Sequence, residues 1–312
     1  MSDYGHELWF GSFITPTARP PQAPIELAQT SERAGLDLVS FQDHPYQSAF
    51  QDTWTLMSYV AARTERIRIS GNVLSLPLRP PAVLARAAAS LDRLTGGRVE
   101  LGIGAGAFWD GIVAMGGRRL EPAQAVRAVE EAVDVIRGLW ATDETGPLRV
   151  TGEFYTVNGA KRGPAPAHRI PIRIGAYKPR MLRLTGKIAD GWLPSLGFLP
   201  EGPASLRAMN EQIDEAASAA GREPAAVSRL LNLSGRFTSG CGGRVASPVT
   251  KLRQRQRRRS CSDAAKRPRF STGCSRRPAA GAVARSWCGA SRVSASQLCF
   301  TTCTARPRTS SG

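Results

Sequence analysis

Short apolar runs alternate with amphipathic stretches along the first 240 residues. Seven apolar runs are predicted to be buried strands, and they cover residues 9–14, 36–41, 67–73, 99–103, 170–174, 189–193 and 230–237. Apolar residues at helical spacing predict helices over residues 23–35, 53–64, 81–95, 122–140, 179–187 and 203–220. A turn-rich segment, 143–168, is expected to hold a small hairpin. Strands that alternate with helices in this way are typical of parallel β/α proteins.

A parallel β/α chain either closes into a barrel or forms an open, doubly wound sheet. An open dinucleotide-binding sheet needs a glycine-rich turn directly after its first strand. Here the first strand ends in Thr15-Pro16-Thr17-Ala18, which is no such turn. Glycine and polar residues instead follow almost every strand, at the end where a barrel assembles its site. The pattern therefore favours an α/β fold of the TIM type, a (β/α) barrel.

The charge is distributed unevenly and divides the chain into a body, 1–240, and a tail, 241–312. The tail holds 16 basic residues, the single acid Asp263 and all six cysteines, whereas the body holds 26 basic and 24 acidic residues. The formal net charge of +17 therefore belongs to the tail, and it excludes a basic nucleic-acid binder as the reading of the whole chain. The body shows no apolar run of eighteen residues and no leader pattern, which predicts a cytoplasmic protein without a membrane span.

Five motifs in the body occur in the order found in one enzyme superfamily. They are Phe41–Pro45, Ser70–Leu74, Ser90–Arg98, Gly102–Asp110 and Ala189–Trp192. Together they resemble the luciferase-like monooxygenases, a superfamily that also holds the oxidoreductases dependent on the deazaflavin coenzyme F420. The resemblance covers roughly residues 8–238.

The resemblance implies an eight-stranded barrel with FMN or the deazaflavin coenzyme F420 at its carboxyl-terminal mouth. It implies hydride transfer to or from a small organic substrate, or its monooxygenation, and the sequence does not separate these two reactions. Relatives of this kind often form homodimers, so a homodimer is expected as well. The cofactor would carry the redox chemistry, while the protein positions it and excludes water.

Asp43 and His44 directly follow the second strand and are the candidate catalytic residues. In related deazaflavin enzymes this pair lies beside the ring, which the resemblance carries over to these two positions. Histidine titrates near neutral pH, so His44 suits proton transfer as hydride moves. The alternative is that His44 only orders its loop or contacts the edge of the ring.

Two strand ends are expected to form a wall of the cofactor site. The resemblance implies a non-proline cis peptide between Asn72 and Val73 that bulges the backbone against the ring. The run Gly104-Ala105-Gly106 lets backbone pass close under a flat ring, with Asp110 as a polar neighbour. A plain tight turn is the alternative for this run.

The cofactor phosphate is expected at the start of a helix. Gly175, Ala176 and Lys178 follow the fifth strand and open a helix whose backbone N–H groups attract phosphate, with Arg180 as a further cation. Gly191 is expected to close the same pocket from the next strand. Trp109 and Trp192 either stack on a ring or belong to the core. No metal site is expected.

The tail has the composition of a disordered segment, because Val, Ile, Leu and Phe make up only 8 of its 72 residues. It is expected to supply neither the last strand nor the last helix of the barrel. A frameshift near residue 239 is the favoured origin, ahead of a basic nucleic-acid-binding arm centred on Arg253–Arg259. A disulfide or zinc module ranks last, because the tail has no Cys-x-x-Cys and no histidine.

An incomplete barrel exposes two unpaired strand edges, so this chain is expected to fold poorly or to be inactive. The contrasting hypothesis is therefore an inactive truncated family member whose basic tail binds nucleic acid non-specifically. That hypothesis predicts an affinity that falls steeply with salt and no bound cofactor.

Overall fold

The strands predicted in the body pair with one another in a single closed sheet. The computed structural model describes residues 4–233 and 299–304. The strands of its main sheet are β1 (Leu8–Ile14), β2 (Leu38–Phe41), β3 (Arg68–Gly71), β4 (Leu74–Ser75), β5 (Val99–Gly104), β8 (Ile172–Ile174), β9 (Gly191–Trp192), β10 (Ser228–Leu233) and β11 (Cys299–Thr304). Their order is β3-β2-β1-β11-β10-β9-β8-β5-β4, and β3 also pairs with β5. This last pairing joins the two ends of the sheet into a barrel.

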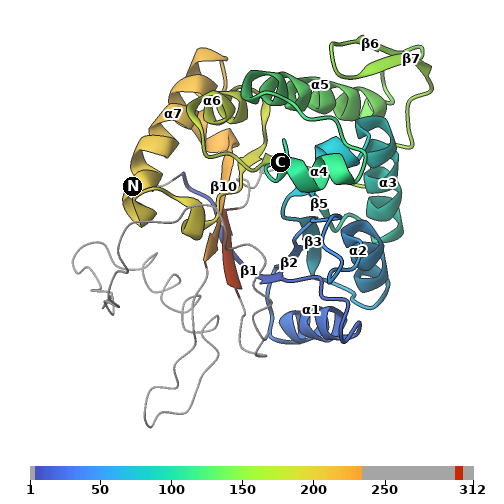
Figure 1. Ribbon diagram of the computed structural model, residues 1–312, viewed down its shortest axis with the longest axis vertical. Coiled ribbons are helices and arrows are strands. Elements are labelled where there is room, and N and C mark those ends of the chain that lie inside the picture. The colour runs from blue at the N-terminus through green and yellow to red at the C-terminus, as the bar shows by residue number, and fades with distance from the viewer. Residues whose placement is uncertain (1–3, 234–298, 305–312) are drawn as a thin grey trace, which may run out of the picture. The chain divides into compact units, whose positions relative to one another are not determined.

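The helices lie outside this sheet, as Figure 1 shows. They are α1 (Ala23–Arg33), α2 (Thr53–Ala62), α3 (Pro81–Leu94), α4 (Trp109–Ala114), α5 (Pro122–Trp140), α6 (Pro179–Ile188) and α7 (Ser205–Ala219). Short 3₁₀ turns are η1 (Leu76–Leu78), η2 (Leu196–Phe198), η3 (Gly202–Ala204) and η4 (Pro224–Ala226). The predicted hairpin is β6 (Leu148–Thr151) and β7 (Thr156–Ala160). The sequence did not predict α4.

Apolar stripes hold the helices on the sheet, as the predicted helical spacing in α5 illustrates. Val129, Val133 and Ile136 lie one turn apart, and all three are fully buried. Glu121 and Gln124 form a capping box at the start of α5, and Pro122 occupies its first turn. Within residues 4–233 and 299–304, no helix is long and apolar enough to cross a membrane.

The interior of the barrel is filled by alternate residues of the strands. Leu38 on β2, Leu193 just after β9 and Leu230 on β10 form one buried cluster, against which Trp9 and Val73 pack. In the sheet, β2 is separated from β10 and β9 by β1 and β11, so Leu38 meets Leu193 and Leu230 across the interior. The same alternation places Glu100 and Arg173 towards the amino-terminal end and Asn72 and Asn232 towards the carboxyl-terminal mouth.

The sequence did not predict the strand that lies between β1 and β10 in the sheet. Cys299–Thr304 fills this position and runs antiparallel to both neighbours, from Leu8 opposite Thr304 to Leu233 opposite Phe300. Among the described residues, this antiparallel strand completes the sheet between β1 and β10. The expectation that the tail supplies no strand at all was wrong, because backbone pairing does not require an apolar sequence pattern. The predicted arm Arg253–Arg259 lies outside the described residues.

Candidate functional site

Three predicted site residues meet at the carboxyl-terminal mouth of the barrel. A Cβ added to Gly104 would lie 2.5 Å from Cγ2 of Val73, and one added to Gly175 would lie 3.3 Å from both methyl groups of Val73. The Val73 side chain therefore sits between the ends of β5 and β8. Only glycine at position 104 leaves room for it. The peptide bond between Asn72 and Val73 is cis, which confirms the cis bond that the resemblance implies.

Asn72 turns its side chain towards the opposite wall of the barrel. Its Nδ2 donates to Oδ1 of Asn232 over 2.8 Å, and Nδ2 of Asn232 donates back to Oδ1 of Asn72 over 3.0 Å. Sequence reasoning did not single out Asn232. The feature of the sequence that could have marked Asn232 is the presence of an amide within the apolar run Leu230–Leu233.

His44 lies in a row of aromatic rings beside the mouth. Its imidazole is 5.4 Å from the ring of Tyr46 and 6.1 Å from that of Phe50, measured between centroids. Phe108, at the start of α4, continues the row at 5.2 Å from Tyr46. Burial lowers the pKa of His44 below its ordinary value, although the negative charge of Asp43 acts to raise it. The imidazole is therefore neutral at pH 7 and able to accept a proton.

Asp43 points away from this row and is held by an arginine. The Nε and Nη2 atoms of Arg79 each lie 2.7 Å from one of its carboxylate oxygens, and the Ser75 amide donates to it over 2.9 Å. Arg79 also contacts Asp52, the N-cap of α2, over 2.7 Å. Burial acts to lower the pKa of Arg79, but the contacts with the two carboxylates outweigh burial and hold this pKa above its ordinary value. Asp43, only 3% exposed, thus joins the β2 and β4 ends.

The segment after β8 supplies backbone and an exposed cation. The Ala176 carbonyl accepts from Nε1 of Trp192 over 2.9 Å, which places this tryptophan in the core, 1% exposed. The hydroxyl of Tyr177 accepts from the amide of Ser195 over 2.9 Å. Lys178 is the N-cap residue of α6 and is exposed, with Pro179 in the first turn.

The segment after β5 leads directly into α4. A Cβ on Gly106, whose φ is +90°, would lie 2.9 Å from Ile112 and 3.4 Å from Trp109, so this turn packs against the helix. Ala105 before it is half-buried. Asp110 lies on the exposed side of α4 and pairs with Arg119. Figure 1 draws α4 inside the ring of the longer helices, close to β5.

Gly191 lies deeper in the barrel than the other predicted residues. It is opposite Arg173 on β8 and Ser228 on β10, and an added Cβ would come within 2.9 Å of the Arg173 side chain. The structure therefore brings Val73, Gly104 and Gly175 together, with Ala176 adjacent in sequence. It does not bring Gly191 or the carboxylate of Asp110 to them.

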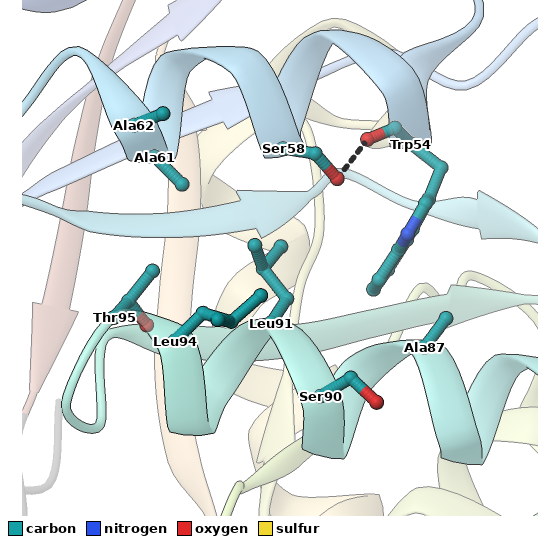
Figure 2. Close-up of a pocket in the computed structure, with 9 residues that line it drawn as sticks. All are labelled: Trp54, Ser58, Ala61, Ala62, Ala87, Ser90, Leu91, Leu94 and Thr95. Carbon is teal, nitrogen blue, oxygen red and sulfur yellow. Dashed lines mark hydrogen bonds between the residues drawn. The ribbon is translucent and has the colours of Figure 1, made fainter.

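A hollow of about 460 Å³ lies elsewhere, on the outer side of the barrel. Figure 2 shows it between α2 and α3, with Trp54 at one end and Leu91 and Leu94 on the facing helix. None of its lining residues is a predicted site residue. Within the described part of the chain, no three His, Cys, Asp or Glu side chains gather as metal ligands.

Known proteins are similar to this chain in sequence. A putative coenzyme F420-dependent oxidoreductase of Mycobacterium tuberculosis is 34% identical over 208 residues, which cover 64% of this chain and 57% of the relative. An F420-dependent glucose-6-phosphate dehydrogenase of Nocardia farcinica is 30% identical over 222 residues, which cover 68% and 64%. The chain thus spans less than two thirds of the length of these relatives.

Solved structures show the same fold. An F420-dependent secondary alcohol dehydrogenase superimposes with a TM-score of 0.63 at 24% identity, over 70% of this chain and 66% of that one. The F420-dependent tetrahydromethanopterin reductase of Methanopyrus kandleri gives 0.61 at 23% identity, over 72% and 65%. The profile of the luciferase-like monooxygenases matches residues 9–235, nearly three quarters of the sequence. The chain belongs to the luciferase-like monooxygenase family.

Proposed function

We propose that the chain is an oxidoreductase that holds a flavin or deazaflavin ring at the carboxyl-terminal mouth of the barrel. The observation that carries the proposal is the meeting of Val73 with Gly104 and Gly175 at three strand ends. The two glycines leave room for the Val73 side chain, which can then support one face of a flat ring at the mouth.

The residues at the mouth suit such a ring chemically. Asn72 and Asn232 are uncharged and hydrogen-bonded to each other, so they place no fixed charge beneath it. Val73, Gly104 and Gly175 would hold one face of the ring, and Lys178 at the start of α6 would attract the cofactor's phosphate. When bound, the cofactor supplies a position that accepts or donates a hydride.

His44 is the proposed proton-transfer residue. Its neutral imidazole, half-buried among Tyr46 and Phe50, suits it to take the proton of a substrate hydroxyl as hydride leaves the carbon. Asp43 does not share this role in the proposal, because Arg79 occupies both of its carboxylate oxygens. Its contribution is to hold the loop that carries His44.

Coenzyme F420 is the first candidate cofactor and FMN the second. The named relatives at 30% identity or more are F420-dependent proteins, whereas the superimposed structures include a riboflavin lyase with modified FMN as well. Hydride transfer is accordingly proposed ahead of monooxygenation, with a small organic molecule as substrate.

Titration of the purified 312-residue chain tests this proposal. Coenzyme F420 and FMN are added separately while cofactor fluorescence and absorbance are followed. We expect saturable binding of F420 at one site per chain, in the micromolar range or tighter. Failure of both cofactors to bind would contradict the proposal, and binding of FMN alone would reverse the order of the two candidates.

The remaining expectations stay predictions. Nucleic-acid binding by the tail rests on residues outside the described part of the chain, and salt-dependent binding without cofactor uptake would favour it.

A homodimer is also proposed. Leu94, beside the hollow between α2 and α3, is 85% exposed and offers an apolar contact for a second copy, and sedimentation of the purified chain tests this proposal. The cytoplasmic location is likewise untested.

A further inference from the structure

Asn232 is a buried amide among the leucines of β10. It lies on β10 between Leu231 and Leu233 and is 2% exposed. A buried carboxamide that loses its hydrogen bonds is costly, so a strand keeps one only where partners are present. Here both ends of the carboxamide are engaged by Asn72, over 2.8 Å and 3.0 Å.

The amide pair forms a bridge across the interior of the barrel. In the sheet, β10 is separated from β3 by β11, β1 and β2, so Asn72 and Asn232 are not strand neighbours. The bridge continues at both ends. Nδ2 of Asn72 also donates to Oγ of Ser40 over 3.2 Å, and Nδ2 of Asn232 donates to Oγ of Ser195 over 3.0 Å.

The bridge ends at the residue that precedes Val73. The backbone amide of Asn72 donates to the Phe41 carbonyl over 2.7 Å, and its side chain is held by Asn232. Asn72 is thus fixed through both its backbone and its side chain. The Val73 side chain, one residue further, then lies between Gly104 and Gly175.

We infer that Asn232 is a positioning residue for the cofactor ring. It acts through the reciprocal amide pair with Asn72 and so holds the strand end that carries Val73 at the mouth. The inference rests on the proposed function, since it concerns the same ring. It adds a residue from the opposite wall of the barrel that no sequence motif had marked.

The first experiment compares Asn232→Ala with Ser228→Ala in the full chain. Both side chains are buried on β10 and both make hydrogen bonds, but Ser228 donates to the Asp190 carbonyl and lies at the other end of the strand. Fluorescence titration gives the dissociation constant of coenzyme F420 for each variant. We expect about tenfold weaker binding for Asn232→Ala and a change of no more than about twofold for Ser228→Ala.

A double-mutant cycle shows whether Asn232 acts through Asn72. The dissociation constant is measured for Asn72→Ala, Asn232→Ala and the double variant. We expect Asn232→Ala to weaken binding about tenfold in the natural chain and less than about twofold when position 72 is already alanine. Equal effects in both backgrounds would overturn the inference, because a general loosening of the barrel does not depend on Asn72.

Asn232→Asp provides a test that does not rely on truncating the side chain. A protonated aspartic acid can donate to Oδ1 of Asn72 and accept from its Nδ2, whereas a carboxylate can only accept. Because position 232 is buried, the pKa of the introduced carboxyl should be raised above its ordinary value. Relative to the natural chain at each pH, we therefore expect F420 binding to be stronger at pH 5 than at pH 8, by up to about tenfold. A ratio that stays constant with pH would overturn the inference.

The outcomes separate the inference from the proposed function. If the natural chain binds F420 or FMN and Asn232→Ala binds it equally well, only the role of Asn232 is refuted. If the natural chain binds neither, the proposed function and the inference fail together. If Asn232→Ala does not fold, the pH dependence of Asn232→Asp decides.

Discussion

The two ends of the barrel interior are built from different chemistry. At the amino-terminal end, Glu100 lies between Arg68, 2.6 Å away, and Arg173, and Arg68 also stacks over the Trp9 ring at 4.9 Å. At the mouth, the polar groups that meet across the interior are the uncharged pair Asn72 and Asn232 with the hydroxyls of Ser40 and Ser195, while the carboxylate of Asp43 is held at the rim by Arg79.

The difference follows from what each end must do. Buried charges are held firmly only when they are paired, so an ion network fixes the positions of β3, β5 and β8. Neutral amides fix geometry without creating a field at the place where a redox ring would change its charge. We therefore infer that the amino-terminal end stabilises the barrel and that the mouth holds the functional site.

Removing β11 should have the largest effect, because β1 and β10 form part of both ends. A chain that stops after Gln297 loses the backbone ladder along Leu8–Phe13 and Leu230–Leu233. We expect loss of about 5 kcal/mol or more, on the scale of the whole stability of a domain, and no sharp thermal transition. A chain that stops after Thr304 is the control. Identical melting of both chains would show that the strand does not close the barrel.

Glu100→Ala tests the charged end. It removes the carboxylate between two guanidinium groups, one of them on Arg173, which is 4% exposed. We expect the free energy of unfolding to fall by about 3–5 kcal/mol in urea denaturation. Glu130→Ala, which breaks the exposed pair with Lys187, should cost less than about 1 kcal/mol. A similar loss in both variants would remove the distinction between buried and exposed pairs.

Exchange of one histidine from each end for asparagine, His44 at the mouth and His168 at the amino-terminal end, compares a chemical role with a structural one. His44→Asn should lower kcat about 100-fold, equal to about 2.7 kcal/mol, with unchanged F420 affinity. His168→Asn, beside Asp92 at 2.9 Å, should leave kcat unchanged and lower stability instead. If His168→Asn reduced kcat as strongly, proton transfer could not be assigned to the mouth.

The pH dependence of kcat/KM tests the proton-transfer role of His44 in a second way. Burial lowers the pKa of His44, so the acid limb of kcat/KM should lie below the ordinary histidine value of about 6.5. More than half of the activity is then kept at pH 6.5, and the rest is lost in stronger acid as the imidazole becomes protonated. An acid limb above pH 6.5 would contradict the assignment.

Asp43→Asn should lower the free energy of unfolding by about 2 kcal/mol, less than Glu100→Ala, because the bidentate contact with Arg79 loses its charge. Asp52→Asn, which alters the more exposed carboxylate of the same arginine, should cost about 1 kcal/mol or less. Asp43→Asn should also lower the pKa of His44 further, since the Asp43 charge raises it. An unchanged acid limb would show that the two groups are not coupled.

Much of the fold could be predicted because strand and helix periods are local. The stripe Val129, Val133 and Ile136 marked α5, and the glycines after β5 and β8 marked the mouth. The helix α4 was missed because six residues give too short a period to recognise. Gly191 was placed at the mouth because sequence order does not show how far a strand extends before its end.

By itself the sequence determined the alternation of strands and helices, the family and the residues Val73, Gly104 and Gly175 at strand ends. The tertiary structure decided that Arg79 holds Asp43, that Asn232 holds Asn72 across 160 positions of sequence, and that Cys299–Thr304 pairs with β1. The physical reason is that periodicity records how each residue faces its own element. A hydrogen bond across a barrel depends on which strands closure brings opposite each other.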